Sequence, residues 1–173
     1  MKTIRRLLIP SLLVGMPAAA SNANESIYSR VQEIGCHDMS KAFFGSWRCS
    51  GPAGYVAEFY DEGNLAGVNI RLGRERTGSS RAAQWRGAGR VFGDLIEWRM
   101  MRGQPVGAVL RRYGTESDPG GEERLFEELA VFKLSPDLSC LVGVVEARRP
   151  NSDELARALA DGARSMPCAQ AKD

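Results

Sequence analysis

The chain has 173 residues, of which 43% are hydrophobic and 25% are charged, so it holds enough apolar material for one domain and is short for two. It contains four cysteines, a single histidine and a formal net charge of +2. One histidine excludes a histidine-rich metal cluster, and the small charge gives no basic excess suited to nucleic acid. We therefore expect no metal, no cofactor and no nucleic-acid partner.

The N-terminus has the pattern of a targeting segment. Basic residues at positions 2, 5 and 6 precede an apolar run over residues 7–20, which a proline and a glycine interrupt. Such a run is too short to span a bilayer, and small residues suited to signal peptidase follow it. We expect a signal peptide over residues 1–23 that is cleaved after Ala23, with cleavage after Ala20 as the alternative. This predicts a periplasmic or secreted protein without a membrane anchor.

The remainder, residues 24–173, is predicted to form a single, mainly β domain. Short apolar runs alternate with turn residues every 8–12 positions, which is typical of an all-β sandwich or barrel. The polar stretch Gly114–Glu123 is the longest break and is expected to be an exposed loop. The expected strands lie near residues 43–50, 54–60, 65–72, 80–88, 95–101, 106–113, 124–134 and 139–147.

Two helices are predicted at the ends of this β region. Residues 25–34 place Ile27, Val31 and Ile34 on one stripe and stop before a glycine. Residues 152–166 begin with a serine suited to N-capping, carry two acidic residues in the first turn and end before a proline.

The phrase Gly45-Ser46-Trp47, followed by Phe59, Gly63, Leu65 and Gly67, resembles the lipocalin-like and avidin-like barrels of bacteria. It is also similar to the barrel of bacterial metalloprotease inhibitors. The resemblance implies an antiparallel up-and-down barrel of about eight strands with short terminal helices. It also implies structural roles for Gly45 and Trp47, with Arg148 or Arg149 packed against that tryptophan.

The cysteines allow three pairings. In a closed up-and-down barrel the first and last strands are antiparallel neighbours, so Cys49 and Cys140 would meet at one rim. Cys36 and Cys168 would then meet at the other end. We therefore expect the disulfides Cys49–Cys140 and Cys36–Cys168.

Catalytic patterns are weak in this sequence. It contains no Gly-x-Ser-x-Gly elbow, and the single histidine, His37, is expected at the surface beside Cys36. A carboxylate pair such as Asp94 and Glu97 suits glycoside chemistry, but its spacing equally fits solvated strand ends. A small exported enzyme using these carboxylates, or an envelope accessory or structural protein, is the alternative function.

A non-catalytic binding module, inhibitor-like or ligand-binding, is the favoured function. Small barrels either fill their interior with side chains or hold one small ligand, and five aromatic residues are candidates for either role: Tyr55, Phe59, Trp85, Trp98 and Phe132. The charge-rich stretches Arg71–Arg90 and Gly114–Glu123 slightly favour a protein partner over a small apolar ligand. The arginines proposed for such a partner surface are Arg71, Arg74, Arg76 and Arg81.

Overall fold

The computed structural model describes residues 24–31, 36–40, 45–73, 79–80, 83–87 and 89–169. The predicted signal peptide at residues 1–23 lies outside these residues, as do Arg74, Arg76 and Arg81. None of the described helices is long and apolar enough to cross a membrane.

The described chain is mainly β, with one α-helix near its C-terminal end. The strands are β1 (Glu25–Arg30), β2 (His37–Asp38), β3 (Gly45–Ser50), β4 (Tyr55–Asp61), β5 (Leu65–Leu72), β6 (Ser79–Ser80), β7 (Ala83–Arg86), β8 (Phe92–Met101), β9 (Gln104–Ser117), β10 (Glu123–Lys133) and β11 (Leu138–Glu146). The helices are α1 (Ser152–Asp161) and the short 3-10 turns η1 (Pro52–Gly54) and η2 (Ala163–Ser165).

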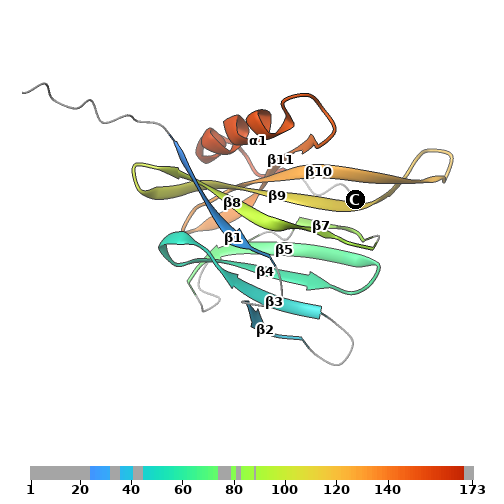
Figure 1. The fold of residues 1–173 in the computed structure, drawn as a ribbon, viewed down its shortest axis with the longest axis horizontal. Helices are drawn as coiled ribbons and strands as arrows, with labels where there is room; N and C mark the ends of the chain where they lie inside the picture. The colour runs from blue at the N-terminus through green and yellow to red at the C-terminus, as the bar shows by residue number, and fades with distance from the viewer. Residues whose placement is uncertain are drawn as a thin grey trace, which may run out of the picture.

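The strands form one curled sheet, in the order β2-β3-β4-β5-β7-β9-β10-β11-β6, and β8 joins β1 to β9. All pairs are antiparallel except the short pair β6–β11. The long strand β9 pairs with β10 and also with β8 and β7, so the sheet folds over at this strand. Figure 1 shows the result, in which β2–β5 form the lower layer and β1 and β8–β11 form the upper layer, with α1 above the upper layer.

The predicted closed barrel is therefore wrong in its closure, although the β class is confirmed. A closed barrel needs backbone pairing between β1 and β3, and no such pairing joins these two described strands. A side-chain bond from Ser29 Oγ to the carbonyl of Ser50, at 3.0 Å, spans the two strands there. The architecture is a half-barrel because β1 ends the upper layer at a free backbone edge of the described sheet.

The predicted helix over residues 25–34 is also wrong, because its first six residues form β1. Residues 25–30 pair with β8 in unbroken register, from Glu25 opposite Met100 to Arg30 opposite Leu95. For a short segment with one apolar stripe, hydrogen-bonding to an exposed strand edge lowers the free energy more than forming an isolated helix of this length does. Val31, expected on the helix stripe, instead enters the core at 4% exposure.

The remaining strand predictions hold with shifted ends, and the C-terminal helix is confirmed but shorter. The predicted loop Gly114–Glu123 is half strand, because β9 continues to Ser117 and β10 begins at Glu123, and only residues 118–122 form the turn between them. Helix α1 begins at Ser152 as predicted, but it ends at Asp161. Ser152 does not cap the helix through its side chain, since its Oγ donates to the carbonyl of Ala147.

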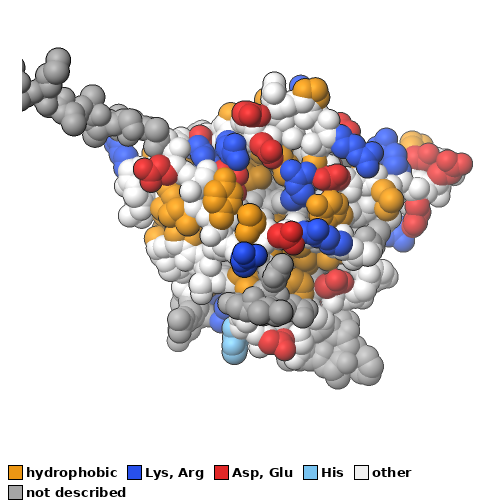
Figure 2. Space-filling view, viewed as in Figure 1, with side chains coloured by type: hydrophobic (Ala, Val, Ile, Leu, Met, Phe, Trp, Pro, Cys, Tyr) orange, Lys and Arg blue, Asp and Glu red, His pale blue; other side chains and the backbone are white. Residues whose placement is uncertain are grey.

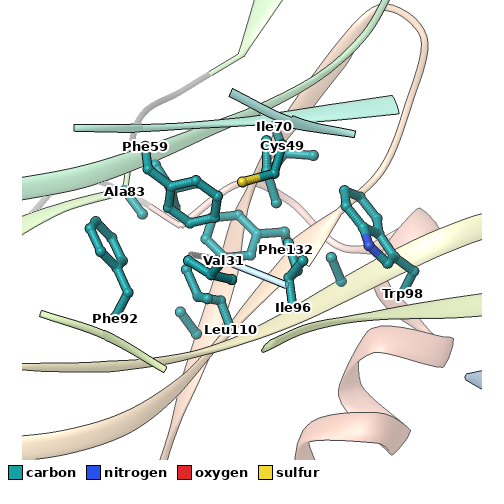
Figure 3. Packing of buried hydrophobic residues seen from close by; sticks show 14 of the residues in the cluster. Val31, Cys49, Phe59, Ile70, Ala83, Phe92, Ile96, Trp98, Leu110 and Phe132 are labelled. Carbon is teal, nitrogen blue, oxygen red and sulfur yellow. The ribbon is translucent and has the colours of Figure 1, made fainter. Parts of the chain in front are cut away.

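The main hydrophobic core fills the space between the two layers. Figure 3 shows Phe59, Ile96, Leu110 and Phe132 pointing toward one another there, and all four are at most 1% exposed. Trp47 packs against Phe59 with a ring-centroid distance of 5.7 Å, and its Nε1 donates to the carbonyl of residue 31.

The other residues to which the lipocalin-like resemblance assigns a role are Arg148, Arg149 and Gly45. Arg148 and Arg149 are exposed in the turn before α1, so the structure does not give them the role implied beside the tryptophan. An added Cβ at Gly45 would meet its neighbours no closer than 3.6 Å, so sterics do not require a glycine there.

A second, smaller core lies under α1 on the outer face of the upper layer. Val109, Leu129 and Val131 pack there against the small side chains of Ala156 and Ala160. The close approach of the helix depends on the absence of a side chain at Gly107 of β9, which lies against the helix backbone at Ala160.

All four cysteines form disulfides, but the predicted pairing is wrong. The bonds are Cys36–Cys49 and Cys140–Cys168. Cys36 precedes β2, and because His37 pairs with Arg48, it lies across from Cys49 on the neighbouring strand. Cys168 lies beside Cys140 because the segment after η2 returns along β11, where Ala169 N donates to the carbonyl of Leu141 at 2.7 Å. Each disulfide thus holds a segment near one end of the domain against the adjacent strand. The predicted pairing required a closed barrel in which Cys49 and Cys140 meet at one rim, and the described sheet is not closed.

Candidate functional site

The β9–β10 hairpin extends past the rest of the sheet as a projecting arm (residues 114–125), which ends in the loop at the right of Figure 1. The two strands pair without a break along this arm, from Gly114 opposite Phe126 to Ser117 opposite Glu123. Apart from this pairing between β9 and β10, the arm pairs with one other strand of the described chain, through Thr115 opposite Arg86 of β7. The arm is therefore a two-stranded element that the fold carries out into solvent.

The turn at the tip of the arm is fixed by its first residue. Asp118 Oδ1 accepts hydrogen bonds from the backbone N–H groups of Gly120 at 2.8 Å and Glu122 at 2.9 Å. The backbone of Asp118 closes the turn by donating to the carbonyl of Glu122 and accepting from Gly121. Gly121 has φ +83, a conformation that suits glycine. The tip is thus held in one conformation by local bonds.

The root of the arm is held by a cation between two aromatic rings. The Arg112 guanidinium lies 5.2 Å from the ring centroid of Trp85 and 5.4 Å from that of Phe126. The same guanidinium binds Glu128 on the paired strand at 2.7 Å. An added Cβ at Gly114 would lie 2.6 Å from Phe126 and 2.8 Å from Trp85, so only glycine fits between these rings. These contacts fix the direction in which the arm leaves the sheet.

The surface of the arm combines one exposed apolar side chain with charge. Leu125 is 69% exposed, more than any other large hydrophobic residue of the described chain. Four acidic residues and one basic residue lie on the arm, which gives it a formal charge of −3. Figure 2 shows the acidic side chains at the right-hand end of the molecule. The charged residues are Glu116, Asp118, Glu122, Glu123 and Arg124.

The five aromatic residues predicted to bind a ligand all lie in the packed core. Phe59, Trp98 and Phe132 are at most 1% exposed, and Tyr55 and Trp85 are 6% exposed. Trp85 is further fixed by its Nε1, which donates to the carbonyl of Tyr113 at 2.9 Å. In this structure their rings contact other protein side chains, as in the Trp85–Phe92 pair at 5.3 Å.

Arg71 is not the surface residue that the sequence led us to expect. It is 3% exposed, and its guanidinium binds Glu58 at 2.6 Å and the carbonyl of Gly73. Glu58 also accepts from Arg48 on the other neighbouring strand. Burial raises the pKa of Glu58, but the hydrogen bonds from Arg71 and Arg48 outweigh it and hold that pKa below its ordinary value. Arg71 on β5 lies beside the Glu58 carboxylate on the adjacent strand β4, and this arrangement favours an internal ion pair over contact with a partner.

The carboxylates considered for catalysis are each bound to a different cation. Asp94 is exposed and pairs with Arg90 at 2.6 Å. Glu97 accepts from Ser26 and from Arg157 of α1, and it lies 3.6 Å from Arg99. Glu97 therefore joins β1, β8 and α1 in a structural network rather than facing Asp94 across a cleft. Among the described residues, no group of three potential metal ligands is found.

A hollow of about 420 Å³ lies at the opposite end of β10 from the arm. The turn between β10 and β11 and Arg164 of η2 line it. Lys133 in its wall is already bound, since its Nζ donates to the carbonyl of Met166 at 2.9 Å. The walls of the hollow mix apolar and charged side chains.

Comparison with protein-family models, curated proteins and solved structures finds no match for this chain. The resemblance to lipocalin-like barrels therefore stays a prediction. Sequence reasoning recognised the charge of Gly114–Glu123 but missed the arm, because it treated the stretch as a loop. The signal was present in Thr115 near the start of the stretch and in Leu125 and Phe126, which follow it after Arg124, because these residue types favour strand over loop.

Proposed function

We propose that this protein is an exported, non-catalytic module that binds another protein through its β9–β10 arm. The observation that carries the proposal is the exposure of Leu125, 69%, on an element whose tip and root are both fixed by hydrogen bonds and ion pairs. A rigid element loses little conformational entropy on binding, so an apolar side chain on it is an effective anchor for a partner's pocket.

Two further observations support this function over binding of a small apolar ligand. The aromatic residues that would line an interior site are packed against one another. The charged arm instead offers the mixed polar and apolar surface typical of protein interfaces. Both disulfides fit an oxidising compartment, which supports export by the predicted signal peptide.

The test compares capture by three forms of the protein. Wild type, Leu125→Asp and the control Leu155→Asp are immobilised and exposed to extract from the native compartment, and bound proteins are quantified by mass spectrometry. Leu155 is a matched control because it is also exposed, 39%, but lies on α1. We expect a partner that wild type and Leu155→Asp retain equally and that Leu125→Asp retains at least about tenfold less, as for the loss of an interface anchor.

The variant must remain folded for this comparison, which circular dichroism and thermal unfolding establish. Because Leu125 is exposed, a charged residue there should change stability by no more than about 0.5 kcal/mol. Partners retained equally by all three forms, or a retained small molecule with no protein, would contradict the proposal.

A further inference from the structure

We infer that the partner presents an apolar pocket with a basic rim, and this inference rests on the proposed function of the arm. The argument starts from the ion pairs on the arm itself. Arg124 binds Glu116 at 2.5 Å, directly across the hairpin, and Glu123 lies 3.5 Å from Arg86 of β7. These two pairs neutralise the charge nearest to Leu125.

The negative charge that these pairs leave lies toward the tip. Of the four acidic residues, Glu116 and Glu123 form ion pairs, and no salt bridge of Asp118 or Glu122 is found among the described residues. The end of the arm therefore carries about two excess negative charges. Asp118 Oδ1 accepts hydrogen bonds from two backbone N–H groups, which fixes the position of its carboxylate without adding a cation. The arm therefore has an ordered pattern, with an apolar side chain beside neutral ion pairs and an acidic end beyond them.

This pattern restricts the class of partner. Phosphate-rich surfaces, such as nucleic acids and anionic membranes, would be repelled by the acidic end. A second copy bound arm to arm would place the same charges against each other, which costs free energy at close range. A protein with an apolar cavity for Leu125 and lysine or arginine beside it matches both parts of the surface.

A random peptide library displayed on phage provides the probe. It is panned against the folded wild-type protein, after removal of phage that bind the Leu125→Asp variant. The selected peptides are synthesised and their affinities measured for wild type, Glu122→Lys and a control, Glu154→Lys. Glu154 is an exposed acidic residue on α1, so its reversal makes the same change in net charge away from the arm.

We expect the selected peptides to combine large apolar residues with lysine or arginine. Reversal at Glu122 should weaken their binding by about three- to tenfold at low salt, and this difference should shrink in 0.5 M salt (roughly a 4 Å Debye length), while Glu154→Lys binds as wild type does. Peptides that require Leu125 but are acidic or uncharged would overturn this inference and leave the proposed function standing. Recovery of no peptide that requires Leu125 would count against both.

Discussion

At the scale of single residues, many charged side chains of the described chain form internal ion pairs. Glu58 on β4 lies between Arg48 on β3 and Arg71 on β5, and its carboxylate oxygens serve both guanidinium groups. The Arg71 side chain is 3% exposed, whereas that of Arg48 is 26% exposed. A buried arginine requires a compensating charge, so the contribution of this cluster to the free energy of unfolding depends mainly on the pair of Glu58 with Arg71.

Replacing this carboxylate tests its contribution. Glu58→Gln should lower the free energy of unfolding by about 3 kcal/mol at neutral pH, because it leaves the Arg71 charge uncompensated. The folded pKa of Glu58 lies below its ordinary value of 4.5, so its stabilisation is complete above that value and is lost as the pH falls through the folded pKa. Urea denaturation at pH 7 and pH 3 should therefore show a large and then a reduced difference from wild type. An equal difference at both pH values would contradict this assignment.

At the scale of elements, α1 is joined to the sheet by close packing and by ion pairs. Arg99 of β8 binds Asp161 at the end of the helix through two hydrogen bonds, at 2.7 and 2.9 Å. Burial raises the pKa of Asp161, but the bonds from Arg99 and Asn24 hold it below its ordinary value. Below the helix, a Cβ added at Gly107 would lie 2.5 Å from the carbonyl oxygen of Ala160. The helix backbone therefore lies on a position that only glycine leaves open.

A methyl group at this position should separate the helix from the sheet. Gly107→Ala is expected to lower the free energy of unfolding by about 1–3 kcal/mol, because the atoms in its way are the backbone carbonyl and Cβ of Ala160, which cannot rotate aside. Gly45→Ala, also in a strand, meets no atom closer than 3.6 Å and should change stability by less than about 0.5 kcal/mol. Chemical denaturation of both variants gives the comparison, and equal stabilities would show that α1 adjusts freely.

At the scale of the whole molecule, a folded-over sheet is held together by its core and by two local disulfides. Cys36–Cys49 closes a sequence separation of 13 residues and Cys140–Cys168 one of 28 residues. Neither bond joins the two layers, so the packing of residues such as Phe59 and Phe132 must hold the layers together. The disulfides instead limit the freedom of the ends of the domain.

Removing each disulfide separately measures this effect. The double variants Cys36→Ala/Cys49→Ala and Cys140→Ala/Cys168→Ala should each lose about 3 kcal/mol, since the stabilisation by a cross-link depends only weakly on loop length. Peptide mapping of the wild-type protein without reduction should yield the two bonded pairs seen here. A peptide that links Cys49 to Cys140 would instead restore the closed-barrel pairing.

The sequence by itself determined the local features of this protein. Alternating apolar residues along Leu65–Leu72 predicted β5, and acidic residues after Ser152 predicted the start of α1, because these patterns depend only on the repeat of a strand or a helix. The phrase Gly45-Ser46-Trp47 placed Trp47 at the start of a strand, and the even number of cysteines in a chain with a predicted signal peptide led us to expect all four to be bonded.

The tertiary structure decided every feature that depends on which strand edges meet. Residues 25–30 form a strand because β8 offers them an edge, and Arg71 is buried because Glu58 lies on the strand beside it. Cys36 bonds to Cys49 because β2 pairs with β3, and the arm projects because β9 and β10 extend beyond the neighbouring strands. Such pairings join residues far apart in the chain, and their free energies come from contacts that a local pattern does not contain.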